Sequence, residues 1–286
     1  MNSPHSNRPE TNEDQRRLAL LIDADNAQPT VIGALLEEVA KYGVASVKRI
    51  YGDFTSTRMT QWKQALLRFS ISPVQQFAYT SGKNATDSTL IIDAMDLLYT
   101  RRFDGFCLVS SDSDFTRLAQ RLREEGLTVY GFGERKTPDP FVQACDKFIY
   151  TELLRQEAAA PTAAKAAPKS KPATPKTKAA KEAAALEAAT PVPAAAEKAP
   201  VSNVPLPAPL SLLRRAIDES SDESRWANLG SVGAYLTKVR PDFDPRLYGH
   251  RKLSELLKAL PEAFGIEERG ADGGPKAVYV RNLKRA

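Results

Sequence analysis

The chain has 286 residues, 42% of them hydrophobic, and a formal net charge of +5. This length predicts roughly two folded domains of about 100–200 residues each. Two cysteines, Cys107 and Cys145, and two distant histidines, His5 and His250, argue against a disulfide framework, a thiolate zinc site and histidine-based catalysis. Residues 1–17 are polar and no apolar run reaches about 18 residues, so we expect a soluble cytoplasmic protein with no membrane association.

Charge is distributed unevenly along the chain. Residues 1–157 carry 19 Lys and Arg against 21 Asp and Glu, residues 158–209 carry 7 against 3, and residues 210–286 carry 14 against 11. An acidic first region joined to basic regions is typical of an enzyme centre tethered to a polyanion-binding part. Ordinary surface charge is the alternative explanation.

The first half of the chain alternates predicted strands with predicted helices. We expect residues 1–16 to be disordered and residues 17–157 to fold. The predicted strands are 18–22, 46–51, 74–79, 106–109 and 127–132, and the predicted helices follow Pro29, cover about 58–69, open at 86–88 and cover about 114–125. A short amphipathic segment, 141–154, ends the region. This alternation predicts βαβ units and a three-layer α/β domain with a parallel sheet.

The second half divides into a linker and a smaller domain. Residues 158–209 are dominated by Ala, Pro, Lys and Thr, which predicts a flexible linker. Residues 210–286 regain apolar periodicity, with predicted helices over 212–217, 229–239 and about 245–260 and a hairpin from 264–269 and 277–280. Three helices followed by a hairpin predict a winged helix-turn-helix.

Five aspartates stand where a predicted strand or loop meets a helix: Asp23, Asp25, Asp87, Asp112 and Asp114. In a parallel sheet such turns lie at the carboxyl edge, so we expect these acids to lie close together. Two carboxylates about 4 Å apart repel by about 4 kcal/mol at an effective dielectric of 20, and hard cations such as Mg²⁺ prefer oxygen ligands. The pattern therefore predicts a divalent metal site.

Each aspartate taken alone is also a candidate helix cap, Asp87 and Asp114 above all. Asp93 and Asp96 lie inside a predicted helix, where a solvated face or a cap is the expected role. A metal in a carboxylate cup can activate water and hold a phosphate oxygen, which is the equipment for phosphodiester hydrolysis. In that chemistry Asn26 would orient a ligand or the water, and Lys83 would contact a phosphate.

Four segments carry a resemblance to a known family: 20–26 (LLIDADN), 83–87 (KNATD), 109–115 (VSSDSDF) and 129–133 (VYGFG). Together they resemble the NYN domain of the PIN-like nuclease superfamily, in its LabA-like branch. The resemblance implies a PIN-like α/β fold and ribonuclease chemistry dependent on Mg²⁺ or Mn²⁺. It places the acidic positions on Asp23, Asp87, Asp112 and Asp114, with Asn26 beside them, and Asp25 ranks second.

The C-terminal region resembles a second family, the LOTUS or OST-HTH domain. The resemblance lies in 226–236 (WANLGSVGAYL), 241–245 (PDFDP), 248–253 (YGHRKL) and 278–280 (VYV). It implies RNA binding or the docking of an RNA-processing protein. The basic residues of the predicted third helix would contact phosphates, with a solvated face as the alternative. These residues are Arg246, His250, Arg251 and Lys252.

We therefore expect a metal-dependent endoribonuclease with an RNA-binding module, and the sequence leaves a homodimer open. The alternative is a non-catalytic RNA-binding or scaffold protein on a PIN-like fold. A haloacid-dehalogenase-like phosphatase with Asp23 as its nucleophile is a third reading. It is disfavoured by Asn26 and Ala27, because that chemistry would place Thr or Val two residues after Asp25.

Overall fold

The computed structural model describes residues 16–55, 57–77, 85–159, 205–269 and 277–283. The predicted disordered N-terminus and most of the predicted linker lie outside these residues. Among the described helices, none has both the length and the apolar character needed to cross a membrane.

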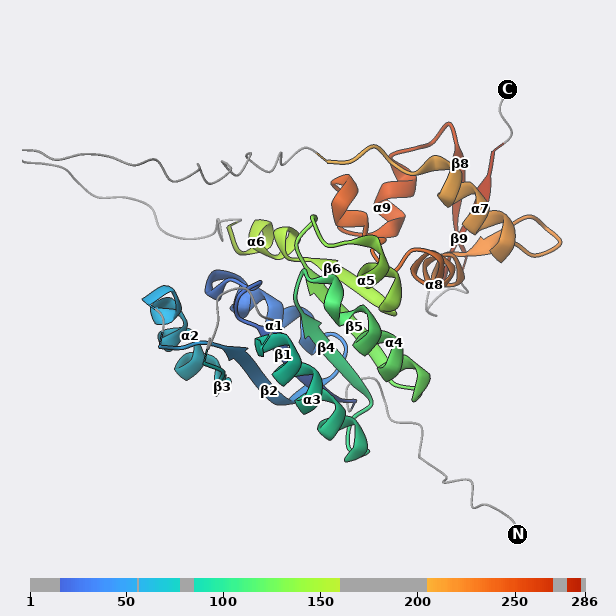
Figure 1. Ribbon diagram of the computed structural model, residues 1–286. Helices are drawn as coiled ribbons and strands as arrows, with labels where there is room; N and C mark the ends of the chain where they lie inside the picture. The colour runs from blue at the N-terminus through green and yellow to red at the C-terminus, as the bar shows by residue number, and fades with distance from the viewer. Residues whose placement is uncertain (1–15, 56, 78–84, 160–204, 270–276, 284–286) are drawn as a thin grey trace, which may run out of the picture. The chain divides into compact units, whose positions relative to one another are not determined.

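A six-stranded, entirely parallel sheet forms the centre of the first domain (Figure 1). Its strands are β1 (Arg17–Asp23), β2 (Val44–Gly52), β3 (Ser72–Gln75), β4 (Gly105–Val109), β5 (Thr128–Gly133) and β6 (Lys147–Tyr150). The order is β3-β2-β1-β4-β5-β6, so the chain winds outward from β1 in one direction and from β4 in the other. Every residue of β4 is buried, as expected for a parallel strand covered on both faces.

Helices cover both faces of this sheet (Figure 1). They are α1 (Ile32–Ala40), α2 (Trp62–Phe69), α3 (Ala85–Tyr99), α4 (Thr116–Glu124), α5 (Asp139–Ala144) and α6 (Thr151–Ala159). Apolar side chains of α1, α2 and α6 join one core, and those of α3, α4 and α5 join the other. Short 3-10 segments precede three of the helices: η2 (Pro29–Val31), η3 (Thr57–Gln61) and η4 (Ser113–Phe115). The predicted three-layer α/β fold is confirmed.

Two expectations for this domain are wrong in detail. The strand expected over 74–79 begins earlier, at Ser72, and its pairing with β2 covers Ser72–Gln75, while residues 78–79 of the expected strand lie outside the described residues. The segment expected to be one amphipathic element, 141–154, contains the end of α5, then β6, then the start of α6. A short apolar run such as 147–150 fits a strand or a helix equally well, and pairing with β5 decides the outcome here.

The C-terminal domain is built from short helices around a small antiparallel sheet. Its elements are α7 (Leu210–Ser220), β7 (Ala227–Asn228), α8 (Leu229–Val239), η5 (Pro245–Tyr248), α9 (Leu253–Lys258), β8 (Phe264–Arg269) and β9 (Ala277–Asn282). The sheet order is β7-β9-β8. Apolar side chains from the helices and the sheet form a separate core, which includes Leu213, Leu236, Leu257 and Val280. This arrangement is winged-helix-like, as the sequence predicts.

The continuous third helix expected over about 245–260 is wrong. The backbone of Gly249 is left-handed (φ 83°) and ends η5 after one turn, and Lys252 is extended at the N-cap of α9. Gly is the residue that adopts a left-handed conformation without strain. The four basic residues expected on one helix therefore lie partly in a turn.

Candidate metal centre

The acidic residues gather where the sheet changes its winding direction. Strands β1 and β4 are neighbours although β2, β3 and three helices separate them in the chain, and Ile22 pairs with Val109 at their carboxyl ends. Neighbouring loops diverge at such a switch point and leave a crevice there, which is where ligands bind in open α/β sheets. Asp23 follows Ile22 and Ser110 follows Val109, so both side chains stand at this point.

Asp23 is the buried anchor of the site, with a residue exposure of only 1%. Its carboxylate accepts three hydrogen bonds, from the side chains of Asn26 (2.7 Å) and Ser110 (2.8 Å) and from the backbone N–H of Asp25 (3.0 Å). Burial raises the pKa of Asp23, while these three hydrogen bonds act in the opposite direction. The bonds fix the orientation of the carboxylate and tie the β1 turn to the β4 turn.

The β4 turn is shaped by its own side chains. The hydroxyl of Ser110 accepts the backbone N–H of Asp112 at 3.1 Å, and the carboxylate of Asp112 accepts the N–H of Asp114 at 2.9 Å. Asp112 is thus the N-cap of η4, whereas Asp114, the stronger cap candidate from the sequence, lies in the first turn of η4. One hydroxyl therefore connects the anchor Asp23 with the turn that presents the two outer acids.

Three carboxylates converge at the mouth of the site. Asp87, Asp112 and Asp114 each place one oxygen within 4.8 Å of the other two. Asp87 comes from the first turn of α3, while the other two follow β4. Burial and the negative charges of Asp23, Asp112, Asp114 and Asp25 raise the pKa of Asp87 to about 6. The fold holds these acids together against their mutual repulsion.

This donor set fits a hard divalent cation. Carboxylate oxygens are the ligands that Mg²⁺ and Mn²⁺ prefer, and the converging trio offers three of them. Asp23 and Asp25, the other two aspartates of the sequence analysis, are not part of the converging trio. Both carboxylate oxygens of Asp23 accept hydrogen bonds, and the side chain of Asp25 is exposed. Lys83 lies outside the described residues.

The structure also adds residues that the sequence analysis did not single out. Ser110 is 2% exposed and joins Asp23 to Asp112 through its hydroxyl. Ser111 is 8% exposed and its hydroxyl accepts the backbone N–H of Glu134, which ties the β4 turn to the segment after β5. The signal available in the sequence was the pair of hydroxyl residues between the apolar strand and the acids.

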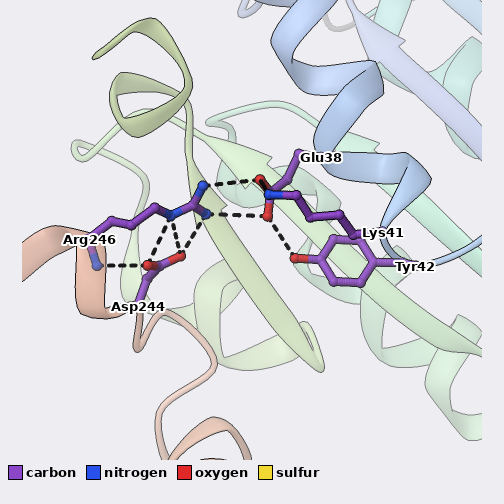
Figure 2. Close-up of polar contacts among 5 residues, drawn as sticks. All are labelled: Glu38, Lys41, Tyr42, Asp244 and Arg246. Carbon is purple, nitrogen blue, oxygen red and sulfur yellow. Dashed lines mark hydrogen bonds and ion pairs between the residues drawn. The ribbon is translucent and has the colours of Figure 1, made fainter. Parts of the chain in front are cut away.

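The four predicted RNA-contacting residues have different surroundings. Arg251 and Lys252 are exposed and His250 is half-buried. The guanidinium of Arg246 instead lies between two carboxylates, those of Asp244 and Glu38 (Figure 2). Its position favours a structural contact over a phosphate contact.

A doubly wound parallel sheet with an acidic centre at its switch point, followed by a winged-helix-like domain, defines the class of this protein. Sequence comparison with family models then gives the two parts their names. Residues 17–154 form an NYN domain, a member of the PIN-like nuclease superfamily, and residues 205–274 form an OST-HTH/LOTUS domain, a type associated with RNA binding.

Comparisons with whole proteins assign no function to this chain. None of the curated proteins matches this chain. An uncharacterized protein from Nitrosomonas europaea, solved by NMR, is 40% identical over 35% of this chain and 95% of its own, with a TM-score of 0.27. A Vibrio parahaemolyticus protein of unknown function, solved by crystallography, is 17% identical over 49% of this chain and 95% of its own, with a TM-score of 0.41.

Proposed function

We propose that this protein is a metal-dependent endoribonuclease whose C-terminal domain binds RNA. The convergence of Asp87, Asp112 and Asp114 at the switch point of an NYN domain carries the proposal. The OST-HTH/LOTUS domain supports RNA as the substrate class. A fold that keeps three carboxylates together, with the pKa of one raised to about 6, has a cost in stability that cation binding would offset.

Each residue has a distinct role in this proposal. The trio of Asp87, Asp112 and Asp114 would hold Mg²⁺ or Mn²⁺ through its carboxylate oxygens. When bound, such an ion activates water and neutralises charge on a phosphate. Asp23 holds Asn26 through a hydrogen bond, and the Asn26 side chain would orient the substrate or the attacking water. The exposed Arg251 and Lys252, with His250 next to them, would contact the RNA backbone.

The direct test is cleavage of end-labelled single-stranded RNA and DNA with Mn²⁺, with Mg²⁺ and with EDTA. We expect cleavage of RNA that requires a metal and is lost in Asp112→Asn, because the amide weakens metal ligation. The amide oxygen can still accept the N–H of Asp114, so the fold should persist. Asp96→Asn, an exposed change on α3, is the matched control and should cleave as the wild type does.

Metal binding can be measured without cleavage. A cation that binds only the folded protein raises its melting temperature by mass action. We expect millimolar Mg²⁺ or Mn²⁺ to raise the melting temperature of the wild type and of Asp96→Asn, and to raise that of Asp112→Asn much less. The absence of a shift in the wild type would contradict a preformed metal site.

The second candidate is a non-catalytic RNA-binding or scaffold protein, favoured by the presence of an OST-HTH/LOTUS domain. It predicts RNA binding without cleavage under every metal condition. In that case the OST-HTH/LOTUS domain would recruit RNA or an RNA-processing protein.

A further inference from the structure

The segment that links α8 to η5 in the OST-HTH domain lies against the NYN domain. Residues 240–246 contact α1 and the strand β6, and both folded domains belong to one compact unit. The contact has two parts, an ion-pair cluster at the end of α1 and a set of hydrogen bonds along β6. We call this contact the seam.

The ion-pair cluster is centred on Glu38 of α1 (Figure 2). The guanidinium of Arg246 donates to both carboxylate oxygens of Glu38, at 3.1 and 3.3 Å. It also donates to the carboxylate of Asp244, at 2.7 Å. Lys41 and the hydroxyl of Tyr42 donate to the same Glu38 carboxylate at 2.7 and 2.9 Å. The planar guanidinium can bridge two carboxylates in this way because it presents five N–H donors in a fixed fork.

These charges are shielded from water. The side chains of Glu38, Asp244 and Arg246 are 3%, 11% and 15% exposed. A buried charge without partners is costly, and removal of one partner from a buried ion pair leaves the other uncompensated. Burial alone would raise the pKa of Glu38, but hydrogen bonds from Lys41 and Arg246 outweigh it and lower this pKa to about 2. The cluster is therefore matched in charge across the seam.

The second part of the seam lies at the edge of the large sheet. The backbone N–H of Phe148 in β6 donates to the carbonyl of Pro241 at 2.9 Å. The hydroxyl of Tyr150 donates to Asp242 at 3.2 Å, and Arg240 holds the same carboxylate through two hydrogen bonds. An edge strand has unpaired backbone groups, and proteins commonly cover such edges with a loop or helix. Here the OST-HTH domain supplies the cover.

On the NYN side of the seam, the ring of Tyr42, whose hydroxyl donates to Glu38, belongs to an aromatic stack. Tyr42 stacks on Tyr130 with ring centroids 4.6 Å apart, and the ammonium of Lys147 lies 5.0 Å from the centre of the Tyr42 ring. Burial lowers the pKa of Lys147. The stacked rings and this desolvated cation support the side of α1 that presents Glu38 to Arg246.

We propose that this seam is a dedicated docking site on the NYN domain, and that its occupant is the OST-HTH domain of the same chain. Arg246 is then a docking residue and contacts no RNA. Charge complementarity across the seam and the backbone bond to β6 favour this occupant, and the covalent connection makes the association intramolecular. The acids stand at the carboxyl ends of the strands, while Glu38 and Tyr42 lie at the end of α1 that leads into the start of β2. Among the described residues, the hydrogen bonds of the seam involve none of the three converging aspartates.

The test uses the full chain with a specific protease site inserted within residues 160–204. After cleavage, we expect the two pieces to co-elute from a gel-filtration column, and Arg246→Gln to weaken their association on the order of tenfold or more. Glu38→Gln should weaken it from the opposite side of the seam, and Tyr150→Phe should weaken it less. Arg215→Gln and Glu37→Gln change exposed residues on α7 and α1 and should have no effect.

Hydrogen exchange in the uncut chain provides a second measurement. The amide of Phe148 should be protected in the wild type and in both controls, and should exchange faster in Arg246→Gln while the amides inside β4 stay protected. Separation of the wild-type pieces, or a Phe148 amide unaffected by Arg246→Gln, would overturn the proposal. Neither measurement involves metal, RNA or RNA cleavage, so failure of the proposed nuclease activity would leave this test intact.

Discussion

At the scale of single residues, Asp87 links function to stability. It faces the negative charges of Asp23, Asp112 and Asp114 from a partly buried position, and its pKa is raised to about 6. A shift of about two units corresponds to about 3 kcal/mol, which solvent screening reduces to about 1–2 kcal/mol of net destabilisation. The arrangement suits a site whose charges are balanced by a cation.

We predict that Asp87→Asn stabilises the protein in EDTA by about 1 kcal/mol. The change removes the repulsion, and the gain is limited because a negative charge in the first turn of a helix is itself favourable. The same variant should lose the stabilisation that Mg²⁺ gives the wild type. Urea unfolding with EDTA and with Mg²⁺ measures both effects, and Asp96→Asn serves as the control. A variant less stable than the wild type in EDTA would contradict the repulsion argument.

Glu38 makes the stability of the fold depend on pH, because its pKa is lowered whereas that of Asp87 is raised. Its pKa in the folded protein is about 2, against 4.5 for the ordinary side chain. The folded state therefore binds this proton less readily than the unfolded chain does. Its contribution is fully present above pH 4.5 and is lost as the pH falls from 4.5 toward 2. Lys41, Tyr42, Lys147, Asp244 and Arg246 surround this carboxylate and set its charge balance.

We predict that the wild type loses about 2 kcal/mol more stability than Glu38→Gln between pH 6 and pH 3. The variant lacks the titrating group, so its curve should be flatter by that amount. Urea unfolding at a series of pH values measures the difference. Glu37→Gln should follow the wild-type curve, and parallel curves for wild type and Glu38→Gln would refute the prediction.

At the scale of elements, the end of β5 is closely fitted to the β4 turn that carries Asp112 and Asp114. A Cβ at Gly133 would come within 2.6 Å of both the carbonyl oxygen of Ser110 and the hydroxyl of Thr137. Ser110 is the residue that joins Asp23 to Asp112. Only a glycine lets β5 approach the β4 turn this closely.

We predict that Gly133→Ala destabilises the fold by about 1–3 kcal/mol through overpacking and also weakens metal binding. The backbone at Ser110 must shift to accept the methyl group, which displaces the hydroxyl that orients Asp23. Melting temperature with and without Mg²⁺ separates the two effects. Gly233→Ala in α8, where the nearest atom is 3.8 Å away, should be neutral or slightly stabilising. A Gly133→Ala variant with wild-type stability would show that the turn has room to relax.

The elements that could be predicted from sequence are those with strong local signals. Strand β4 is an apolar run followed by polar turn residues, and α8 has its apolar residues at helical spacing, so both were found. Strand β6 was missed because four residues carry too little periodicity, and its identity depends on pairing with β5. The prediction of one long third helix was wrong because Gly249 takes a left-handed conformation, which the apolar spacing around it does not reveal.

In the candidate site too, some features follow from the sequence and others depend on tertiary contacts. That Asp87 would meet Asp112 and Asp114 follows from parallel βαβ topology, because turns at the carboxyl edge converge. The role of Ser110 could not be predicted, because it depends on the register that sets Ile22 beside Val109. The burial of Arg246 could not be predicted either. Its partner Glu38 is 208 positions away in the sequence. Without knowledge of that partner, an arginine in a polar segment is interpreted as an exposed cation.

At the scale of the whole molecule, docking separates two kinds of basic residue in the OST-HTH domain. Arg246 is neutralised by Glu38 and Asp244, whereas Arg251 and Lys252 remain exposed. Cations that contact phosphates release counterions on binding, so each contact to single-stranded RNA adds about −0.7 to the slope of log K against log salt. The salt dependence of RNA affinity can therefore distinguish the two kinds of residue.

We predict that a variant with both Arg251→Gln and Lys252→Gln binds RNA more weakly and that its salt slope is shallower by about 1.4. Arg246→Gln should leave the slope nearly unchanged, because its charge does not reach phosphate. Fluorescence anisotropy with a labelled single-stranded RNA from low to moderate salt, in EDTA to prevent cleavage, measures both slopes. A shallower slope for Arg246→Gln would mean that Arg246 leaves Glu38 and contacts RNA when RNA binds, and the two folded domains would then separate on substrate binding.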